Sequence, residues 1–230
     1  MGLSENLRRV QQRVNDATVK AGRDLGSVRL LAASKRTDAQ GVLDTIQLGH
    51  TLFGENRAQS LRDKFDIVNP VHPNAEWHFI GYLQKNKVKY VVGRASMVHS
   101  VDSQELASAI ARRINQQRST GVVLNPMKVL VQIKLGTEDS KTGIAPEPAL
   151  KLCHLITQMP ELELCGLMNI APLQGEPEQW FSEMATLADR ARNEGFNIQE
   201  MSMGMSGDME TAIQYGATIV RVGSDIYWAN

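Results

Sequence analysis

The chain has 230 residues, of which 42% are hydrophobic and 22% charged, a composition typical of globular proteins. Its 25 lysines and arginines balance its 25 aspartates and glutamates, so the formal net charge is zero. This charge balance does not indicate general binding to nucleic acid or to an anionic membrane. A core of this size needs no disulfide or metal, and no stretch approaches the roughly 18 apolar residues of a membrane span.

Apolar residues alternate between helix and strand patterns along the chain. Residues 3–21 predict an amphipathic helix, because apolar side chains recur there at spacings of three and four. Eight short apolar runs follow, separated by segments with helical periodicity, and the last helix is predicted to be short or missing. The predicted strands are 28–33, 51–54, 77–81, 97–101, 128–133, 164–170, 201–203 and 218–222.

This alternation predicts the fold. Continuous apolar strands separated by helices are typical of a parallel sheet covered by helices. Eight such units predict one α/β domain over residues 1–230, folded as a closed (β/α)8 TIM barrel. An open doubly wound sheet is the alternative, but no G-x-G-x-x-G follows the first strand, which removes the main sign of a dinucleotide-binding version.

The N-terminus and the cysteines indicate a compartment. Asn6, Arg8 and Arg9 interrupt any apolar run, so no signal peptide is predicted. Cys153 and Cys165 lie in apolar contexts without metal-ligand spacing, which predicts buried free thiols in a reducing environment. We therefore expect a cytoplasmic protein.

Lys35 is the first candidate for chemistry, because it stands with Ser34 just past the first apolar run, at the strand end where this fold places its active face. One interpretation is a lysine whose stem covers the barrel rim while its amine stays in water. The other is an amine buried among apolar walls that forms a Schiff base with a carbonyl compound. Burial would lower the pKa of that lysine and so enlarge its nucleophilic, neutral fraction.

Glycine and serine occupy the loops after the seventh and eighth predicted strands. Gly204 and Gly207 let the backbone approach a ligand closely, and Ser206 is a predicted N-cap of the helix that follows. Gly223 and Ser224 follow the eighth strand. This fold often builds a phosphate site from these two loops, so together they predict one, although either loop alone is also explained by ordinary turn chemistry.

Other features leave more than one interpretation open. His78 lies between two aromatic residues on the third strand and is either a hydrogen-bonded core histidine or a ligand contact. The five histidines lack any metal-binding spacing, so no metal site is predicted. The basic segment 84–94 indicates a solvated helix face, with a nucleic-acid patch or a protein-interaction surface as alternatives. Met203 and the methionines near it are interpreted as barrel packing.

Seven motifs occur in one order along the chain: A-S-K, F-G-E-N, W-H-F-I-G-x-L-Q-x-N-K, S-K-x-G-I, G-L-M-x-I, S-M-G-M-S-x-D-M-x-x-A-I and V-R-V-G-S. Together they resemble the pyridoxal phosphate homeostasis protein family, which is related to the N-terminal domain of alanine racemase. The resemblance implies pyridoxal 5'-phosphate held as a Schiff base on Lys35, with Asn56 beside the cofactor ring and Arg221 facing the pyridine nitrogen. The cofactor-binding residues that we expect are Lys35, Asn56, His78, Met203, Ser206, Arg221, Gly223 and Ser224.

The resemblance also implies a biological role. The family is linked to homeostasis of vitamin B6 and of amino and keto acids, without an established catalytic activity. An arginine facing the pyridine nitrogen discourages its protonation and weakens the electron sink, so we expect no catalytic residue and no robust turnover. A low-activity fold-type III enzyme such as an amino-acid racemase is the alternative. We expect a monomer with no nucleic-acid or membrane partner, and pyridoxal-phosphate-dependent apoenzymes as possible recipients of the cofactor.

Overall fold

The structure, a computed structural model, describes residues 2–136, 142–172 and 175–228; Ser140 and Lys141 of the fourth motif lie outside this part. Eight parallel strands close into a barrel in chain order, and β8 pairs with β1. This confirms the predicted (β/α)8 fold. The strands are β1 (Arg29–Ala33), β2 (Leu52–Glu55), β3 (Glu76–Phe79), β4 (Met97–Val101), β5 (Met127–Ile133), β6 (Leu162–Asn169), β7 (Glu200–Ser202) and β8 (Ile219–Val222).

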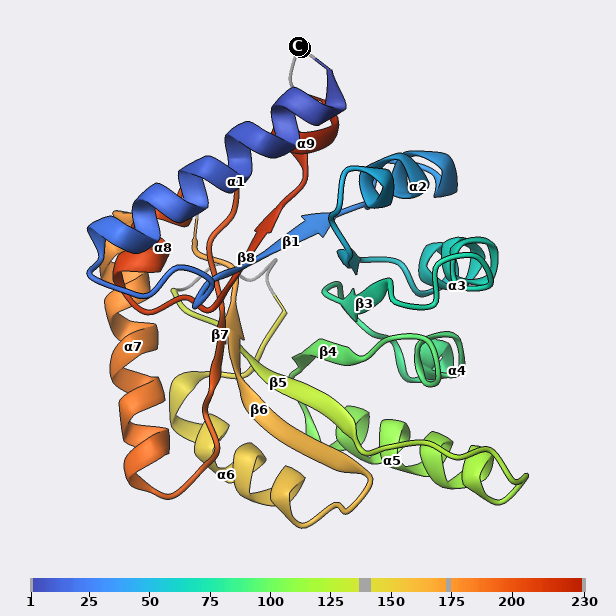
Figure 1. The fold of residues 1–230 in the computed structure, drawn as a ribbon. Helices are drawn as coiled ribbons and strands as arrows, with labels where there is room; N and C mark the ends of the chain where they lie inside the picture. The colour runs from blue at the N-terminus through green and yellow to red at the C-terminus, as the bar shows by residue number, and fades with distance from the viewer. Residues whose placement is uncertain (1, 137–141, 173–174, 229–230) are drawn as a thin grey trace.

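Helices surround the barrel and follow its strands in turn (Figure 1). The first helix precedes the barrel and packs against the last two helices. The helices are α1 (Leu3–Lys20), α2 (Ala39–Gln47), α3 (Ala58–Val68), α4 (Val88–Val91) after the 3-10 turn η1 (Lys85–Lys87), α5 (Gln104–Arg118), α6 (Pro146–Thr157), α7 (Pro177–Asn193), α8 (Met209–Gln214) and α9 (Ser224–Tyr227).

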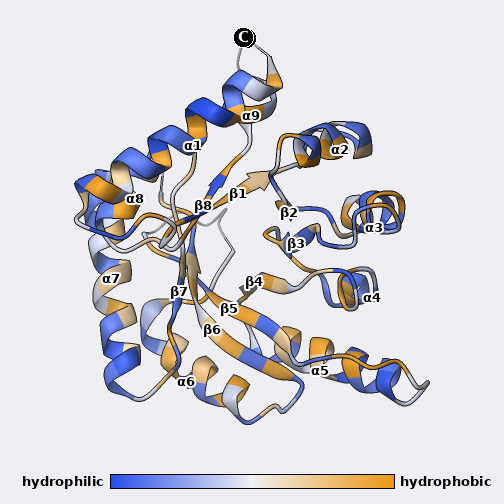
Figure 2. Ribbon diagram, in the orientation of Figure 1, coloured by the Kyte–Doolittle hydropathy of each residue, from blue (hydrophilic) through white to orange (hydrophobic). Residues whose placement is uncertain are grey.

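The core has two layers because successive strand side chains point to opposite faces. The larger layer lies between barrel and helices, whose apolar and polar stripes are visible in Figure 2. The smaller layer fills the barrel interior and includes Leu31, Leu130 and Cys165. Both cysteines are free and buried, as predicted, and burial raises the pKa of Cys153 to about 12 and of Cys165 to about 11.

The basic segment differs from the single helix predicted from about Gln84. Lys85–Lys87 forms a 3-10 turn, and the helix after it spans only Val88–Val91. Gly93, with φ 84°, turns the chain just after this helix. Arg94 then pairs with Asp66 at 3.0 Å, so the segment presents no continuous basic helix face.

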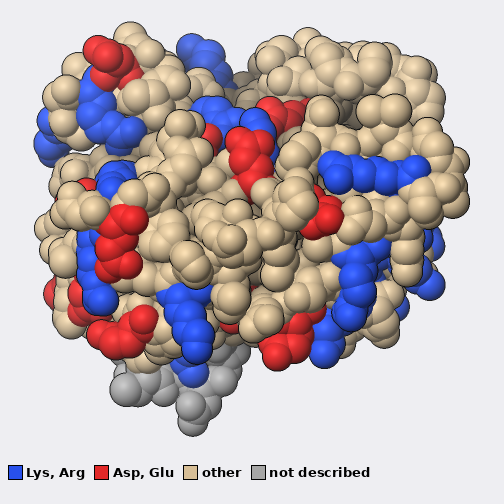
Figure 3. Space-filling model, turned by 90° about the horizontal axis from the view of Figure 1, so that it is seen from below, with Lys and Arg blue, Asp and Glu red and all other residues tan. Residues whose placement is uncertain are grey.

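The surface shows charges of both signs. In the view from below, blue and red side chains are interspersed (Figure 3), which agrees with the balanced composition. No helix in the described ranges is long and apolar enough to cross a membrane. Among the same residues, no three histidine, cysteine or acidic side chains are grouped to hold a metal ion.

A charged cluster closes the amino-terminal end of the barrel. Arg29 forms ion pairs with Glu200 at 2.7 Å and with Glu76 at 3.7 Å. Glu76 also lies 2.8 Å from Nε2 of His78. The hydrogen bond with His78, with a further contribution from the charge of Arg29, lowers the pKa of Glu76 to about 2 against the opposing effect of burial.

This cluster predicts an acid-sensitive contribution to stability. The folded-state pKa of Glu76 lies below its ordinary value of 4.5, so its carboxylate stabilises the fold above that value and loses this effect as the pH falls toward about 2. The difference in free energy of unfolding between wild type and Glu76→Gln should therefore shrink over that range. Urea denaturation at about pH 6, 4 and 3 measures it. Glu183→Gln, at an exposed position, is the control, and a pH-independent difference for Glu76→Gln would contradict the prediction.

Candidate functional site

A cavity of about 570 Å³ opens at the carboxyl end of the barrel strands. This size is typical of small-molecule sites. Its walls come from the segments after β1, β2, β3, β6, β7 and β8 and from the C-terminal segment. The structure brings six of the eight expected residues together in this wall, namely Lys35, Asn56, Ser206, Arg221, Gly223 and Ser224.

Lys35 lies on a turn at the cavity mouth and is exposed. The expectation of an amine buried among apolar walls is therefore wrong. The buried run ends with Ser34, and the chain turns at the next residue, so the lysine leaves the barrel interior. Within the described part of the chain, its amine makes no hydrogen bond or ion pair, which leaves it accessible to a ligand in the cavity.

A buried ion pair holds the turn that carries Lys35. Nζ of Lys64, on α3, lies 2.5 Å from Oε1 of Glu55 and donates to the carbonyl oxygen of Ser34 at 2.6 Å. The hydroxyl of Ser34 donates to the same carboxylate at 2.6 Å. Because Glu55 is fully buried and the Lys64 side chain is only 10% exposed, this pair fixes the end of β1 to β2 away from water.

The loops after β7 and β8 meet at their serines. The hydroxyl oxygens of Ser206 and Ser224 lie 2.9 Å apart. Ser206 does not cap α8 as predicted, because it lies in a turn and Asp208 occupies the N-cap position. The Asp208 side chain instead accepts from the amide of Met205 at 2.6 Å and shapes this turn. Gly204 has φ 92°, a conformation that favours glycine.

Arg13, which the sequence analysis missed, supports both serine loops from α1. Its guanidinium pairs with Glu210 on α8 and with Asp225 on α9, each at 2.7 Å. A third bond, at 3.0 Å, goes to the carbonyl oxygen of Ser206. The hydrogen bond with Glu210 is the main cause that raises the pKa of Arg13. One side chain thus joins the two loops from outside the cavity.

Arg221 brings a buried cation to the cavity floor. Its Nη1 donates to Oγ of Ser202 and its Nη2 to the carbonyl oxygen of Asn169, both at 2.7 Å. Neither partner is a carboxylate, and burial lowers the pKa of Arg221 to about 10. The guanidinium therefore stays charged at neutral pH. It makes no ion pair with the described residues, and the charge of Asp208 opposes the effect of burial on its pKa.

Asn56 is held by a close approach of backbone. A Cβ added at Gly81 would lie 2.1 Å from the carbonyl oxygen of Asn56, so a larger residue would displace this segment. Both residues line the cavity. The glycine after β3 therefore permits the placement of the asparagine after β2.

His78 and Met203 lie outside the residues that line the cavity. Both are fully buried. The ring nitrogens of His78 are engaged by Glu76 and by His99, at 2.8 and 2.9 Å. The structure therefore places His78 as a hydrogen-bonded histidine of the barrel interior, and Met203 in the core between barrel and helices.

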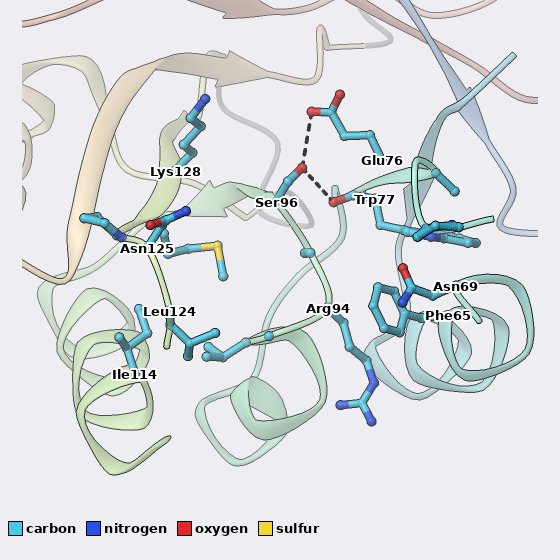
Figure 4. A pocket seen from close by; sticks show the side chains of 17 residues that line it. Phe65, Asn69, Glu76, Trp77, Arg94, Ser96, Ile114, Leu124, Asn125 and Lys128 are labelled. Atoms are coloured by element: carbon cyan, nitrogen blue, oxygen red, sulfur yellow. Dashed lines mark hydrogen bonds between the residues drawn. The ribbon is translucent and has the colours of Figure 1, made fainter. Parts of the chain in front are cut away.

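A second hollow, of about 420 Å³, lies at the opposite, amino-terminal end of the barrel. Figure 4 shows Ser96 between Glu76 and Trp77, with its hydroxyl 3.2 Å from the carboxylate of the first and the carbonyl oxygen of the second. Lys128 lies on another part of the wall. None of the eight expected cofactor-binding residues lines this hollow.

Comparison with known proteins agrees with the fold. The family model described as alanine racemase, N-terminal domain, matches residues 2–230. A pyridoxal phosphate homeostasis protein from Vibrio cholerae is 38% identical over 98% of this chain and 95% of its own. A crystal structure of an unknown protein from Bifidobacterium adolescentis has a TM-score of 0.89 at 33% identity, covering 98% of this chain and 94% of its own. PipY of Synechococcus elongatus with PLP bound has a TM-score of 0.82 at 28% identity, covering 98% and 100%.

The buried pair of Lys64 and Glu55 gives a prediction about stability. Lys64→Met keeps most of the side-chain volume but leaves a buried carboxylate without its cation, which should lower the free energy of unfolding by about 3 kcal/mol. Lys151→Met, at an exposed position on α6, is the matched control and should change it by less than about 0.5 kcal/mol. Urea denaturation at neutral pH measures both, and equal effects in the two variants would contradict the prediction.

Proposed function

The chain belongs to the family of pyridoxal phosphate homeostasis proteins, and from this premise we propose that it binds pyridoxal 5'-phosphate in the barrel-mouth cavity, with Lys35 as the covalent anchor. One observation carries the proposal: an accessible amine and the two joined serine loops line the same cavity. The related structure of PipY with PLP bound supports the choice of ligand.

The chemistry of the cavity wall suits this cofactor. Its described residues include three cationic side chains, Lys35, Arg36 and Arg221, and no acidic one. Such a wall favours an anion such as a phosphate ester. When bound, pyridoxal phosphate supplies an aldehyde that condenses with a primary amine and a phosphate that accepts hydrogen bonds.

Each wall element has a separate role in the proposal. Lys35 offers the amine, while Ser206 and Ser224 offer hydroxyl groups and their loops offer amides for the phosphate. Asn56 lies beside the ring, and Arg221 directs its guanidinium at the pyridine nitrogen. A guanidinium that is cationic at neutral pH opposes protonation of that nitrogen, since two positive charges would meet.

The same wall argues for a carrier rather than a catalyst. Racemisation by proton transfer on opposite faces of the α-carbon would need a second acid or base beside the lysine. The described wall residues include no histidine, cysteine, tyrosine or carboxylate. An exposed anchor also favours transfer of the cofactor to another protein. The proposal therefore makes the chain a monomeric cytoplasmic reservoir that supplies apoenzymes and takes part in vitamin B6 and amino and keto acid homeostasis, without robust turnover.

The anchor is tested by reductive trapping. Protein incubated with pyridoxal phosphate should absorb visible light, and borohydride should fix the cofactor on Lys35, as located by peptide mass spectrometry. Lys35→Ala should lose this label, whereas Lys85→Ala, a control at another lysine, should keep it. A colourless wild-type protein, or a label that stays in Lys35→Ala, would overturn the proposal.

The carrier role is tested separately by isotope exchange. We expect deuterium exchange at the α-carbon of alanine or serine to be no faster with the loaded protein than with free pyridoxal phosphate, because a cationic Arg221 opposes protonation of the pyridine nitrogen and so weakens the electron sink. Proton NMR in deuterium oxide measures the rate. Exchange that is faster than with free cofactor and is lost in Lys35→Ala would instead establish the low-activity enzyme.

A further inference from the structure

A continuous line of polar side chains runs through the barrel interior from one end to the other. It starts at Arg221 on the cavity floor, whose Nη1 lies 2.7 Å from Oγ of Ser202. That oxygen lies 2.9 Å from Nδ1 of His99, and Nε2 of His99 lies 2.9 Å from Nδ1 of His78. The line ends at Glu76, 2.8 Å from Nε2 of His78, beside the amino-terminal hollow.

The chemistry of these groups fixes the direction of every bond. The carboxylate of Glu76 only accepts and each neutral ring has one donor and one acceptor nitrogen, so every bond runs toward Glu76. Ser202 accepts from the guanidinium of Arg221, which only donates, and directs its own proton to Nδ1 of His99. His99 then carries its proton on Nε2 and donates it to Nδ1 of His78. His78 in turn donates from Nε2 to the carboxylate of Glu76. Each group accepts once and donates once between a cation and an anion.

Both histidines are suited to this arrangement, because it requires neutral rings. His78 and His99 are fully buried, and burial is the main cause that lowers the pKa of each. The charged groups that act on the two rings are Arg221 from the cavity end and Arg29, Glu76 and Glu200 from the other end. A protonated His99 would also face the guanidinium of Arg221, which disfavours it further.

We propose that Ser202, His99 and His78 are positioning residues for Arg221, linked as a one-directional hydrogen-bond chain to Glu76 at the opposite end of the barrel. The chain and the carbonyl oxygen of Asn169 engage two of the five N–H groups of Arg221. The remaining three make no hydrogen bond within the described residues, and Arg221 lines the cavity. Any effect of this hydrogen-bond chain on bound pyridoxal phosphate rests on the proposed function.

The hydrogen-bond chain contributes to the electrostatic surroundings of Arg221. Arg221 is buried and cationic and makes no ion pair within the described residues, although the charge of Asp208 raises its pKa against the effect of burial. The aligned dipoles of a hydroxyl and two imidazoles place negative ends toward the guanidinium and positive ends toward Glu76. Low dielectric surroundings strengthen such polarised chains. Glu76 is thus the acceptor end of a hydrogen-bond chain that begins at Arg221, and a substitution at one end should alter the hydrogen bonds at the other.

The first test uses the ligand-free protein and nitrogen NMR of its five histidines. In ¹⁵N-labelled wild type, His78 and His99 should both be neutral and carry the proton on Nε2 from about pH 6 to 8. In Ser202→Ala, the Nδ1 resonance of His99 should move downfield, because it loses its proton donor. Ser100→Ala is the matched control: this buried hydroxyl on β4 has no hydrogen-bond partner among the described residues.

The second test adds pyridoxal phosphate. Binding should shift the ring nitrogens of both His99 and His78 in wild type and in Ser100→Ala, and the shift at His78 should be lost in Ser202→Ala. Three outcomes would overturn the proposed hydrogen-bond chain. They are a proton on Nδ1 of either ring, titration of either ring near pH 6.5, and identical behaviour of the two serine variants. If pyridoxal phosphate causes no change in visible absorption, the proposed function is overturned instead. The ligand-free spectra would still test the hydrogen-bond chain.

Discussion

Closure of the parallel sheet is the constraint on which the rest of this structure depends. Because all eight strands run in one direction and β8 pairs with β1, segments that are far apart in the sequence end at one rim. That rim gathers an amine from the turn after β1 and two hydroxyls from the loops after β7 and β8. The hydrogen-bonded ring carries the stability, so the loops at its mouth are free to hold polar and exposed groups.

The barrel interior departs from an apolar core along the hydrogen-bond chain from Arg221 to Glu76. Polar groups buried in low dielectric are costly unless each is hydrogen-bonded. Here every ring nitrogen of His78 and His99 has a partner. A satisfied network of this kind fixes rotamers and tautomers together, which gives the floor of the cavity a defined arrangement of donors rather than a flexible cation.

The sequence predicted the fold well because each strand of a covered parallel sheet is a run of apolar residues. It located Lys35 because this residue and Ser34 stand just past such a run. It could not predict the exposure of that lysine, which depends on where the turn begins. Lys64 was hidden because it shares the buried face of α3 with Leu61 and Val68, and only folding brings it to Glu55. His99 lies inside an apolar strand, and its inward direction follows from barrel register, which spacing alone does not reveal.

The contacts of Arg13 have a consequence for how the protein is made. This residue of the first helix binds Ser206 and Asp225, partners that are 193 and 212 positions later in the chain. During synthesis, α1 emerges long before those partners exist, so the two serine loops cannot be joined until the last strand has left the ribosome. The cavity wall that these loops form is therefore complete only after the segments around residues 206 and 225 have been made.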